Sequence, residues 1–225
     1  MPRGTGPRLG PPPFYRQHLD FTCGPASLIM AMARYQPGLV AGPELEVDLW
    51  REANLVEAYA TSRQGLALAA YRRGFRVRTA GNAQTLELLE NLGLDLTPPA
   101  RLVARKLHQD LQRRCRRAGI PDTGSRVSCR ELSGWLRRGW TPLVLVNATL
   151  VGDVDQPHWV VVVRCTPRQV VLHDPLARAG GSRLSRPRFE KGLGYRGLCC
   201  AVVVEGLRED PSSPGRPRTG APPPG

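Results

Sequence analysis

Several patterns that mark particular protein classes are missing from this 225-residue chain. No run of about 18 apolar residues occurs, so no segment is expected to span a membrane. Residues 1–13 carry charge but no apolar stretch, which excludes a secretory signal. No C-x-x-C pair occurs among the six cysteines, which argues against zinc or thioredoxin-like chemistry. We therefore expect free thiols in a reducing, cytoplasmic setting, with no metal and no cofactor.

Lysine is also scarce. Only Lys106 and Lys191 occur, so the formal charge of +13 comes almost entirely from arginine. The arginines are scattered, with local clusters at residues 72–78, 113–117 and 183–188. No nucleic-acid-binding motif accompanies them, which argues against a nucleic-acid partner. An anionic partner or substrate stays open.

Proline, glycine, arginine and serine dominate both ends of the chain. Residues 1–13 and 208–225 have few apolar side chains to bury, and we expect them to be disordered tails. The folded domain is expected over residues 14–207. Its first part, residues 23–138, has helical patterns, and residues 142–207 are rich in strand patterns.

The hydrophobic period changes along the domain. Helices are predicted near residues 24–35, 44–59, 65–73, 83–92 and 100–118, and a capping box from Ser128 to Glu131 starts another that ends near residue 138. Residues 75–79 fit a short strand or an extended link. Valine-rich strands are predicted at residues 142–147, 158–164, 169–174 and 199–205. Helices followed by strands favour an α+β fold with a mostly antiparallel sheet.

Cys23 stands at the start of the first helix, which is apolar nearly all round and should be buried. A helix N-terminus carries about half a positive charge, which stabilises a thiolate. Gly24 would let a substrate backbone approach the sulfur. These features fit a nucleophile; the alternative is a cysteine that only packs in the core.

His158 opens one predicted strand and Asp174 ends the next. A hairpin turning at residues 165–167 would place them directly opposite each other, with Cβ atoms about 5 Å apart. That separation suits an imidazole held by a carboxylate, as in a catalytic triad. The alternative is an ion pair at the end of a sheet.

Gln17 precedes Cys23 by a short loop and could supply a hydrogen bond to an oxyanion, together with the Cys23 backbone N–H. As a lone residue it could equally be a solvated amide. His18 and Trp159 neighbour the candidate residues and could contact substrate, although the strand parity of Trp159 favours core packing. His173 directly precedes Asp174 in its strand, so its side chain should face away from the site. His108 lies in an arginine-rich helix and should be solvated.

These blocks together resemble a known family. The chain resembles the bacteriocin-processing (double-glycine leader) peptidases, in particular a stand-alone bacterial branch. The similarity lies in residues 17–27 (QHLDFTCGPAS), 157–162 (PHWVVV) and 173–175 (HDP), and also in residues 49–53, 65–70 and 189–194. The resemblance spans residues 14–205. It implies a papain-like fold in which a buried central helix carries the cysteine at its N-terminus. It also implies a Cys/His/Asp triad of Cys23, His158 and Asp174, with Gln17 in the oxyanion hole.

The expected activity is thiol-dependent hydrolysis of a peptide or amide bond in a peptide or protein substrate. Two alternatives stay open. The same triad could pass the acyl group to an acceptor other than water, as in transglutaminases and arylamine acetyltransferases. The scaffold could also be a non-catalytic module that binds peptide or nucleic acid.

Overall fold

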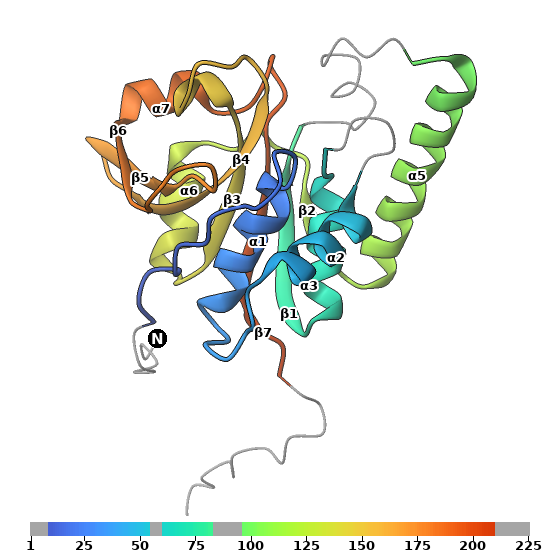
Figure 1. Cartoon of the computed structure of the whole chain (residues 1–225), viewed down its shortest axis with the longest axis horizontal. Helices are drawn as coiled ribbons and strands as arrows, with labels where there is room; N and C mark the ends of the chain where they lie inside the picture. Colours follow the sequence, from blue (N-terminus) through green and yellow to red (C-terminus); the bar gives the residue numbers. More distant parts are fainter. Residues whose placement is uncertain (1–8, 55–59, 83–95, 210–225) are drawn as a thin grey trace, which may run out of the picture.

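The computed structural model of the chain describes residues 9–54, 60–82 and 96–209. One seven-stranded sheet runs through it in the order β2-β1-β7-β3-β4-β5-β6 (Figure 1). The strands are β1 (Phe75–Gly81), β2 (Asp122–Thr123), β3 (Thr141–Asn147), β4 (Pro157–Cys165), β5 (Gln169–His173), β6 (Ser182–Ser185) and β7 (Cys200–Leu207). Neighbouring strands are antiparallel except β1 and β2. The predicted α+β class with a mostly antiparallel sheet is confirmed.

Helices cover both faces of this sheet. They are α1 (Cys23–Ala33), α2 (Pro43–Ala53), α3 (Arg63–Arg72), α5 (Pro98–Arg117), α6 (Cys129–Arg137) and α7 (Arg186–Gly192), and a 3-10 turn η1 (Ala148–Leu150) follows β3. The side chains of β4 alternate between two cores. Trp159 and Val161 pack with α1, α2 and α3, whereas Val160 and Val162 pack with α6 and α7. This alternation is the period-2 pattern that places successive strand residues on opposite faces.

Helix α1 lies in the middle of the molecule, between the sheet and the helices α2 and α3 (Figure 1). Every residue from Gly24 to Met32 is buried, as the all-round apolar sequence predicts. Ser27, the one polar residue in this run, donates a hydrogen bond of 3.2 Å to the carbonyl of Trp159 in β4. The helix that begins with Cys23 is therefore fixed directly to the strand that begins with Pro157 and His158.

Most predicted elements occur where the sequence places them. The Ser128–Glu131 capping box is present at the start of α6. Helix α2 ends at Ala53, so its predicted extension falls partly on residues 55–59, which lie outside the described residues. The helix predicted at residues 83–92 also lies outside them. The strands β2 and β6 were not predicted, because neither has a valine-rich or alternating apolar pattern.

One boundary prediction needs correction. The expected tail of residues 1–13 is too long, because Pro12 is buried and its carbonyl lies 3.0 Å from Nε2 of His173. Arg34 also donates a hydrogen bond of 2.9 Å to the carbonyl of Gly10. Within the mainly helical first part of the domain, the short strand that the sequence allows at residues 75–79 is β1, which joins the sheet beside β7.

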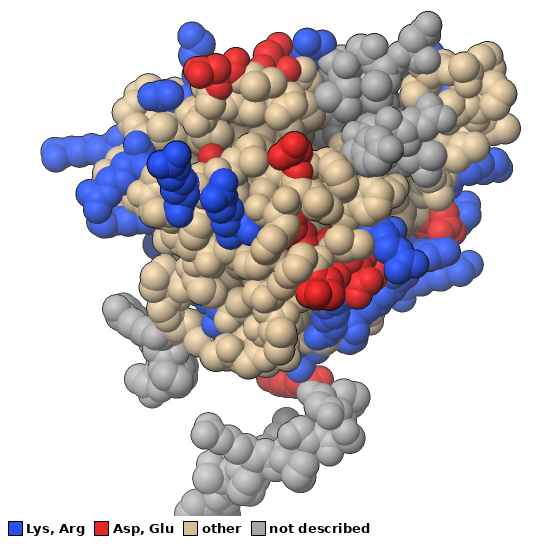
Figure 2. Space-filling view, viewed as in Figure 1, with Lys and Arg blue, Asp and Glu red and all other residues tan. Residues whose placement is uncertain are grey.

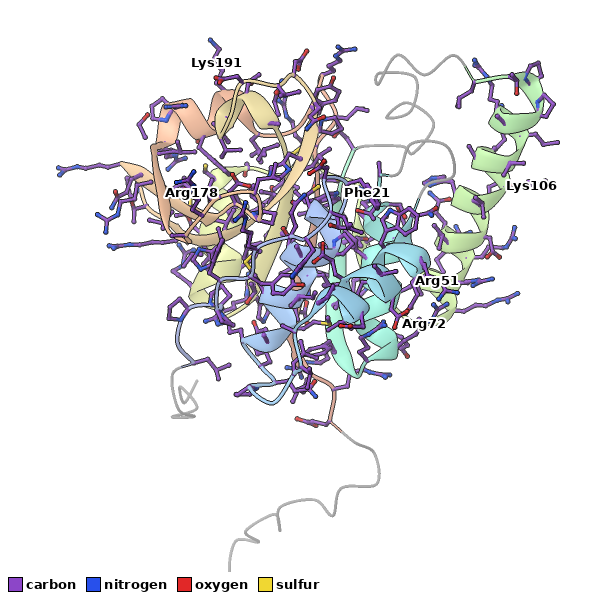
Figure 3. The ribbon with its side chains drawn as sticks, in the orientation of Figure 1. Phe21, Arg51, Arg72, Lys106, Arg178 and Lys191 are labelled. Atoms are coloured by element: carbon purple, nitrogen blue, oxygen red, sulfur yellow. The ribbon has the colours of Figure 1, made fainter. Side chains whose placement is uncertain are left out.

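Basic side chains lie over much of the surface. The lysines Lys106 on α5 and Lys191 on α7 lie far apart, and Arg51 and Arg72 project from the α2–α3 side (Figure 3). Among the residues that the structure describes, no helix has the length and apolar character needed to cross a bilayer.

Candidate active site

Cys23 is the first residue of α1, directly after the N-cap Thr22. The residue is partly accessible, and no acidic residue lies in the first turn of the helix. Burial alone would raise the pKa of the Cys23 thiol, but the positive charge and hydrogen bond of the His158 ring, with hydrogen bonds from the backbone at Trp159 and Gly24, lower it overall. The site thus favours a thiolate at Cys23.

His158 is the partner that stabilises this thiolate. Its ring is 2% exposed, and its Nε2 lies 2.7 Å from Oδ1 of Asp174. Burial would lower the pKa of His158, but the Cys23 sulfur on one side and the Asp174 carboxylate on the other raise it well above its usual range. Both shifts favour the ion pair of a thiolate and an imidazolium.

The hairpin that joins His158 to Asp174 has a different register from the predicted one. Val161 pairs with His173 and Val162 pairs with Leu172. Asp174 is the residue after the end of β5, and this register places it opposite Val160. The turn occupies residues 166–168, and a bulge interrupts the ladder between Val162 and Arg164. The predicted opposite pairing is therefore wrong by two residues. Because two residues are one full pleat, both side chains stay on one face and meet diagonally.

Gln17 lies in the loop that leads into α1 and is 8% exposed. Its backbone N–H donates a hydrogen bond of 3.0 Å to the carbonyl of Pro175, the residue after Asp174. Its side-chain Nε2 donates one of 2.6 Å to the carbonyl of Leu19, and Oε1 is buried without a hydrogen bond to any residue that the structure describes. The loop that precedes Cys23 is thus tied to the chain that carries Asp174.

Glu46 on α2 is a part of this site that sequence reasoning missed. The residue is fully buried, and its carboxylate accepts hydrogen bonds from the Tyr15 hydroxyl at 2.8 Å, from the His18 backbone N–H at 3.0 Å, and from the Thr22 hydroxyl. Burial would raise the pKa of Glu46, but these hydrogen bonds lower it below its usual range. One carboxylate therefore holds both ends of the loop that contains Gln17.

A signal for Glu46 is present in the sequence. The buried residues of α2 are Glu46, Leu49 and Ala53, which follow one helical stripe. A glutamate on the buried stripe of an amphipathic helix needs hydrogen-bond partners inside the protein.

The other candidate residues have structural contacts. A Cβ on Gly24 would overlap the Thr61 hydroxyl, so its side-chain face is closed by Thr61 and not open to a substrate backbone. His18 is half-exposed, and its Nδ1 lies 3.0 Å from Oε2 of Glu46. Trp159 is buried in the core beside α1, as its parity predicts.

The two remaining histidines are both buried. His173 is buried; its Nε2 faces the carbonyl of Pro12, and its Nδ1 accepts a hydrogen bond from the Gly181 N–H. His108, which was expected to be solvated, is buried, and burial lowers its pKa. The helix that carries His108 packs against α3, which explains this difference.

The Peptidase_C39 like family matches residues 12–185, more than half of the chain. The chain belongs to this family. No curated protein sequence matches it.

Solved structures include proteins whose folds are similar to that of this C39-like chain. A protein from Bacillus anthracis described as a C39-like peptidase is 15% identical over 85% of this chain and 93% of its own, with a TM-score of 0.50. The peptidase domain of Streptococcus ComA, a bi-functional ABC transporter involved in quorum sensing, is 17% identical over 84% of this chain and 96% of its own, with a TM-score of 0.43. The family match and the likeness to the Bacillus anthracis protein give the C39-like chain a papain-like fold, as its sequence predicts.

Proposed function

We propose that this chain is a cysteine peptidase that hydrolyses a peptide or amide bond through an acyl-enzyme. Cys23 is the nucleophile, His158 the base, Asp174 the residue that orients His158, and Gln17 an oxyanion donor. The observation that carries the proposal is the 2.7 Å contact between Nε2 of the buried His158 ring and the Asp174 carboxylate. It stands beside a cysteine at the N-terminus of a buried helix, and the charge of His158 lowers the pKa of that cysteine. Membership of the Peptidase_C39 like family supports the same activity.

The reaction follows from these contacts. Because Nε2 of His158 is bound to Asp174, Nδ1 is the ring nitrogen left to take the proton from the Cys23 thiol. The thiolate attacks the carbonyl carbon, and the imidazolium gives its proton to the leaving amine. Water then loses a proton to His158 and attacks the thioester, which releases the acid and restores the free thiol.

The oxyanion needs two donors while each tetrahedral intermediate exists. Gln17 has two N–H bonds on Nε2 and uses one for the Leu19 carbonyl, so the second is left for substrate. The backbone N–H of Cys23 is the other donor in this proposal. Loss of one such donor typically slows turnover by about 100-fold or more.

Labelling with iodoacetamide tests the nucleophile. Burial raises the pKa of Cys115, Cys129 and Cys200 to about 12 each and also raises that of Cys199, so these thiols should react slowly at neutral pH. We expect rapid modification of Cys23 and none in a folded Cys23→Ala variant.

Cys165 gives the matched control, since it is the other partly accessible cysteine. A Cys165→Ser variant should label as fast as the wild type. Preferential modification of Cys165, with Cys23 inert at neutral pH, contradicts the proposal. Peptide products identified by mass spectrometry, with and without added amine, then show whether water is the acyl acceptor.

A further inference from the structure

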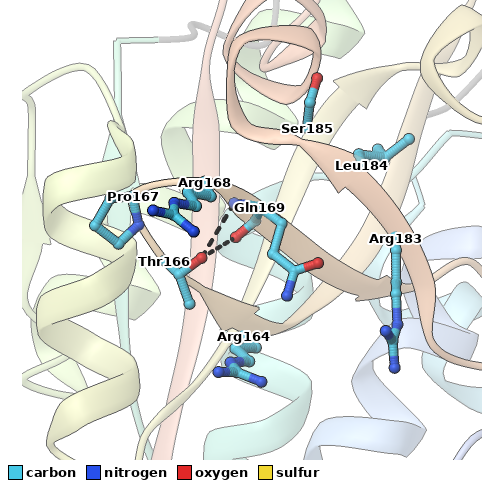
Figure 4. Close-up of a pocket in the computed structure, with 8 residues that line it drawn as sticks. All are labelled: Arg164, Thr166, Pro167, Arg168, Gln169, Arg183, Leu184 and Ser185. Carbon is cyan, nitrogen blue, oxygen red and sulfur yellow. Dashed lines mark hydrogen bonds between the residues drawn. The ribbon is translucent and has the colours of Figure 1, made fainter.

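Three arginines surround an open pocket at the turn end of the β4–β5 hairpin, the end opposite to His158. The pocket has a volume of about 730 Å³, and Arg164, Arg168 and Arg183 are among the residues that line it (Figure 4). Thr166, Gln169 and Ser185 add polar groups to its walls. None of the residues that line it is acidic.

The sheet register holds two of these arginines on the same face. Arg164 of β4 and Arg183 of β6 both pair with Val171 of β5, which lies between them. Two strand spacings separate their Cα atoms by about 10 Å. The bulge between Val162 and Arg164 turns Arg164 to this face, and Figure 4 shows Arg164 and Arg183 extending to the same side of the hairpin, with the Gln169 amide between them.

Nothing among the described residues neutralises this charge. Nearby Arg186 is paired with Glu190 at 2.8 Å. In contrast, the guanidinium groups of Arg164, Arg168 and Arg183 have no ion pair or hydrogen bond with any residue that the structure describes, and all three residues are exposed. Figure 2 shows basic side chains gathered on the β5–β6 side of the molecule, on the left of the view. Like charges gathered in one place repel each other, so folding gives no reason for this arrangement.

Guanidinium groups bind carboxylates with two parallel hydrogen bonds, and three of them around one pocket fit several carboxylates in succession. Single-stranded nucleic acid would also need aromatic side chains on which its bases stack. The residues that line the pocket include none, since the apolar members are Pro167 and Leu184. These observations favour an acidic polypeptide.

We infer that the Arg164–Arg168–Arg183 pocket binds an acidic segment of the polypeptide substrate. This inference rests on the proposed peptidase function and adds a substrate class to it. Arg164 follows His158 by six residues of β4, or about 20 Å. At least about six extended residues are therefore needed between the acidic segment and the bond that is cleaved.

Binding to a defined probe tests the pocket. The Cys23→Ala protein is titrated with a fluorescein-labelled hexaglutamate peptide and with its hexaglutamine counterpart, at about 0.15 M salt so that weak long-range attraction is screened. We expect hexaglutamate to bind more tightly. The combined variant Arg164→Gln, Arg168→Gln and Arg183→Gln should weaken its binding by about tenfold or more, since each charge-assisted pair contributes to affinity.

The combined variant Arg105→Gln, Arg116→Gln and Arg117→Gln is the matched control. It removes the same charge from exposed positions on α5 and should leave hexaglutamate binding within about twofold of the parent. Equal weakening by both combined variants overturns the inference, because general attraction to a basic protein would then explain binding. No preference for hexaglutamate over hexaglutamine also overturns it. The inference is also overturned if a thymidine oligonucleotide binds more tightly than hexaglutamate and the substitution of the three pocket arginines abolishes that binding.

Iodoacetamide labelling of Cys23 separates this inference from the proposed function. For this experiment the three pocket substitutions are made in the wild-type chain, which retains Cys23, and the variant should label at the wild-type rate. Unreactive Cys23 in the wild type contradicts the peptidase proposal. Reactive Cys23 together with hexaglutamate binding that is insensitive to the pocket variant contradicts the acidic-substrate inference alone.

Discussion

His158 Nε2 lies 2.7 Å from Asp174 Oδ1, although the two residues are not opposite each other in their hairpin. Asp174 follows the last residue of β5, and its Oδ1 also accepts a hydrogen bond of 2.9 Å from the backbone N–H of Leu176. The loop that follows β5 therefore fixes the Asp174 carboxylate independently of its contact with the imidazole. This geometry holds the His158 ring in one orientation toward Cys23.

Replacement of Asp174 by Asn should keep the fold and reduce turnover by about 100-fold to 10,000-fold. The amide cannot stabilise an imidazolium and can favour the wrong tautomer of His158. Steady-state kinetics on a cleaved peptide, with circular dichroism of the variant, measure the effect. Asp153→Asn is the control, since Asp153 is an exposed acid in the loop before His158, and it should retain parental turnover.

The pH dependence of alkylation should report the ion pair between Cys23 and His158. The pKa of Cys23 is lowered, so its thiolate persists as the pH falls below about 8.5, the value for an ordinary thiol. A cysteine-containing reference peptide instead loses about tenfold in rate for each pH unit. We expect the Cys23 rate, measured by mass spectrometry from about pH 6 to 9, to fall much less than that of the reference peptide.

His158→Gln supplies the control for this profile. Without the imidazolium, the burial that raises the pKa of Cys23 is no longer offset by its largest opposing contribution. The alkylation rate should then fall steeply toward acid pH. A flat profile in this variant would mean that the helix N-terminus, and not His158, maintains the thiolate.

The sequence predicted the fold where one physical signal dominated. The apolar residues of α1 predict a buried helix, and the valine runs predict β3, β4, β5 and β7. Strand β6, with the sequence Ser-Arg-Leu-Ser, has no such signal, because an edge strand packs little apolar surface. Its pairing with β5 depends on tertiary contacts that no local pattern encodes.

The placement of the candidate residues was predictable to a similar extent. Helix N-terminal position singled out Cys23, and strand parity placed His158 and Asp174 on one face. The bulge near Val163 could not be predicted, because no proline or glycine marks it, and it shifted the turn and the register together. Glu46 was missed because a charged residue within an amphipathic helix is usually assigned to its solvated face.

Gly24→Ala should destabilise the protein by about 1–3 kcal/mol, since a Cβ there would overlap the Thr61 side chain and approach Leu66. Denaturant unfolding measures the loss. Adding Thr61→Ala should restore part of it, because the overlapping hydroxyl is removed. Gly38→Ala, at a position with open space, should have little effect. Loss of activity in Gly24→Ala with unchanged stability would instead indicate that Gly24 contacts substrate.

Glu46→Gln should lower both stability and turnover. The variant replaces a carboxylate oxygen by an NH₂ group that faces the backbone N–H of His18 or the hydroxyl of Thr22. Leaving such buried groups without acceptors costs about 1–3 kcal/mol. The loop that carries Gln17 should lose its fixed position, so turnover should fall more than peptide binding does. Unfolding curves and the separate measurement of kcat and KM test both effects.

The pH dependence distinguishes an ionised Glu46 from a neutral one. Its pKa is lowered in the folded protein, so its stabilising contribution is complete above the unfolded value of about 4.3 and is lost as the pH falls through the folded value. The stability difference between the wild type and Glu46→Gln should therefore be largest above about pH 5 and shrink below about pH 4. Glu44→Gln, an exposed position in the first turn of the same helix, should change stability by only a few tenths of a kcal/mol. A difference between wild type and Glu46→Gln that stays constant across this range would mean that Glu46 holds the loop as a neutral acid.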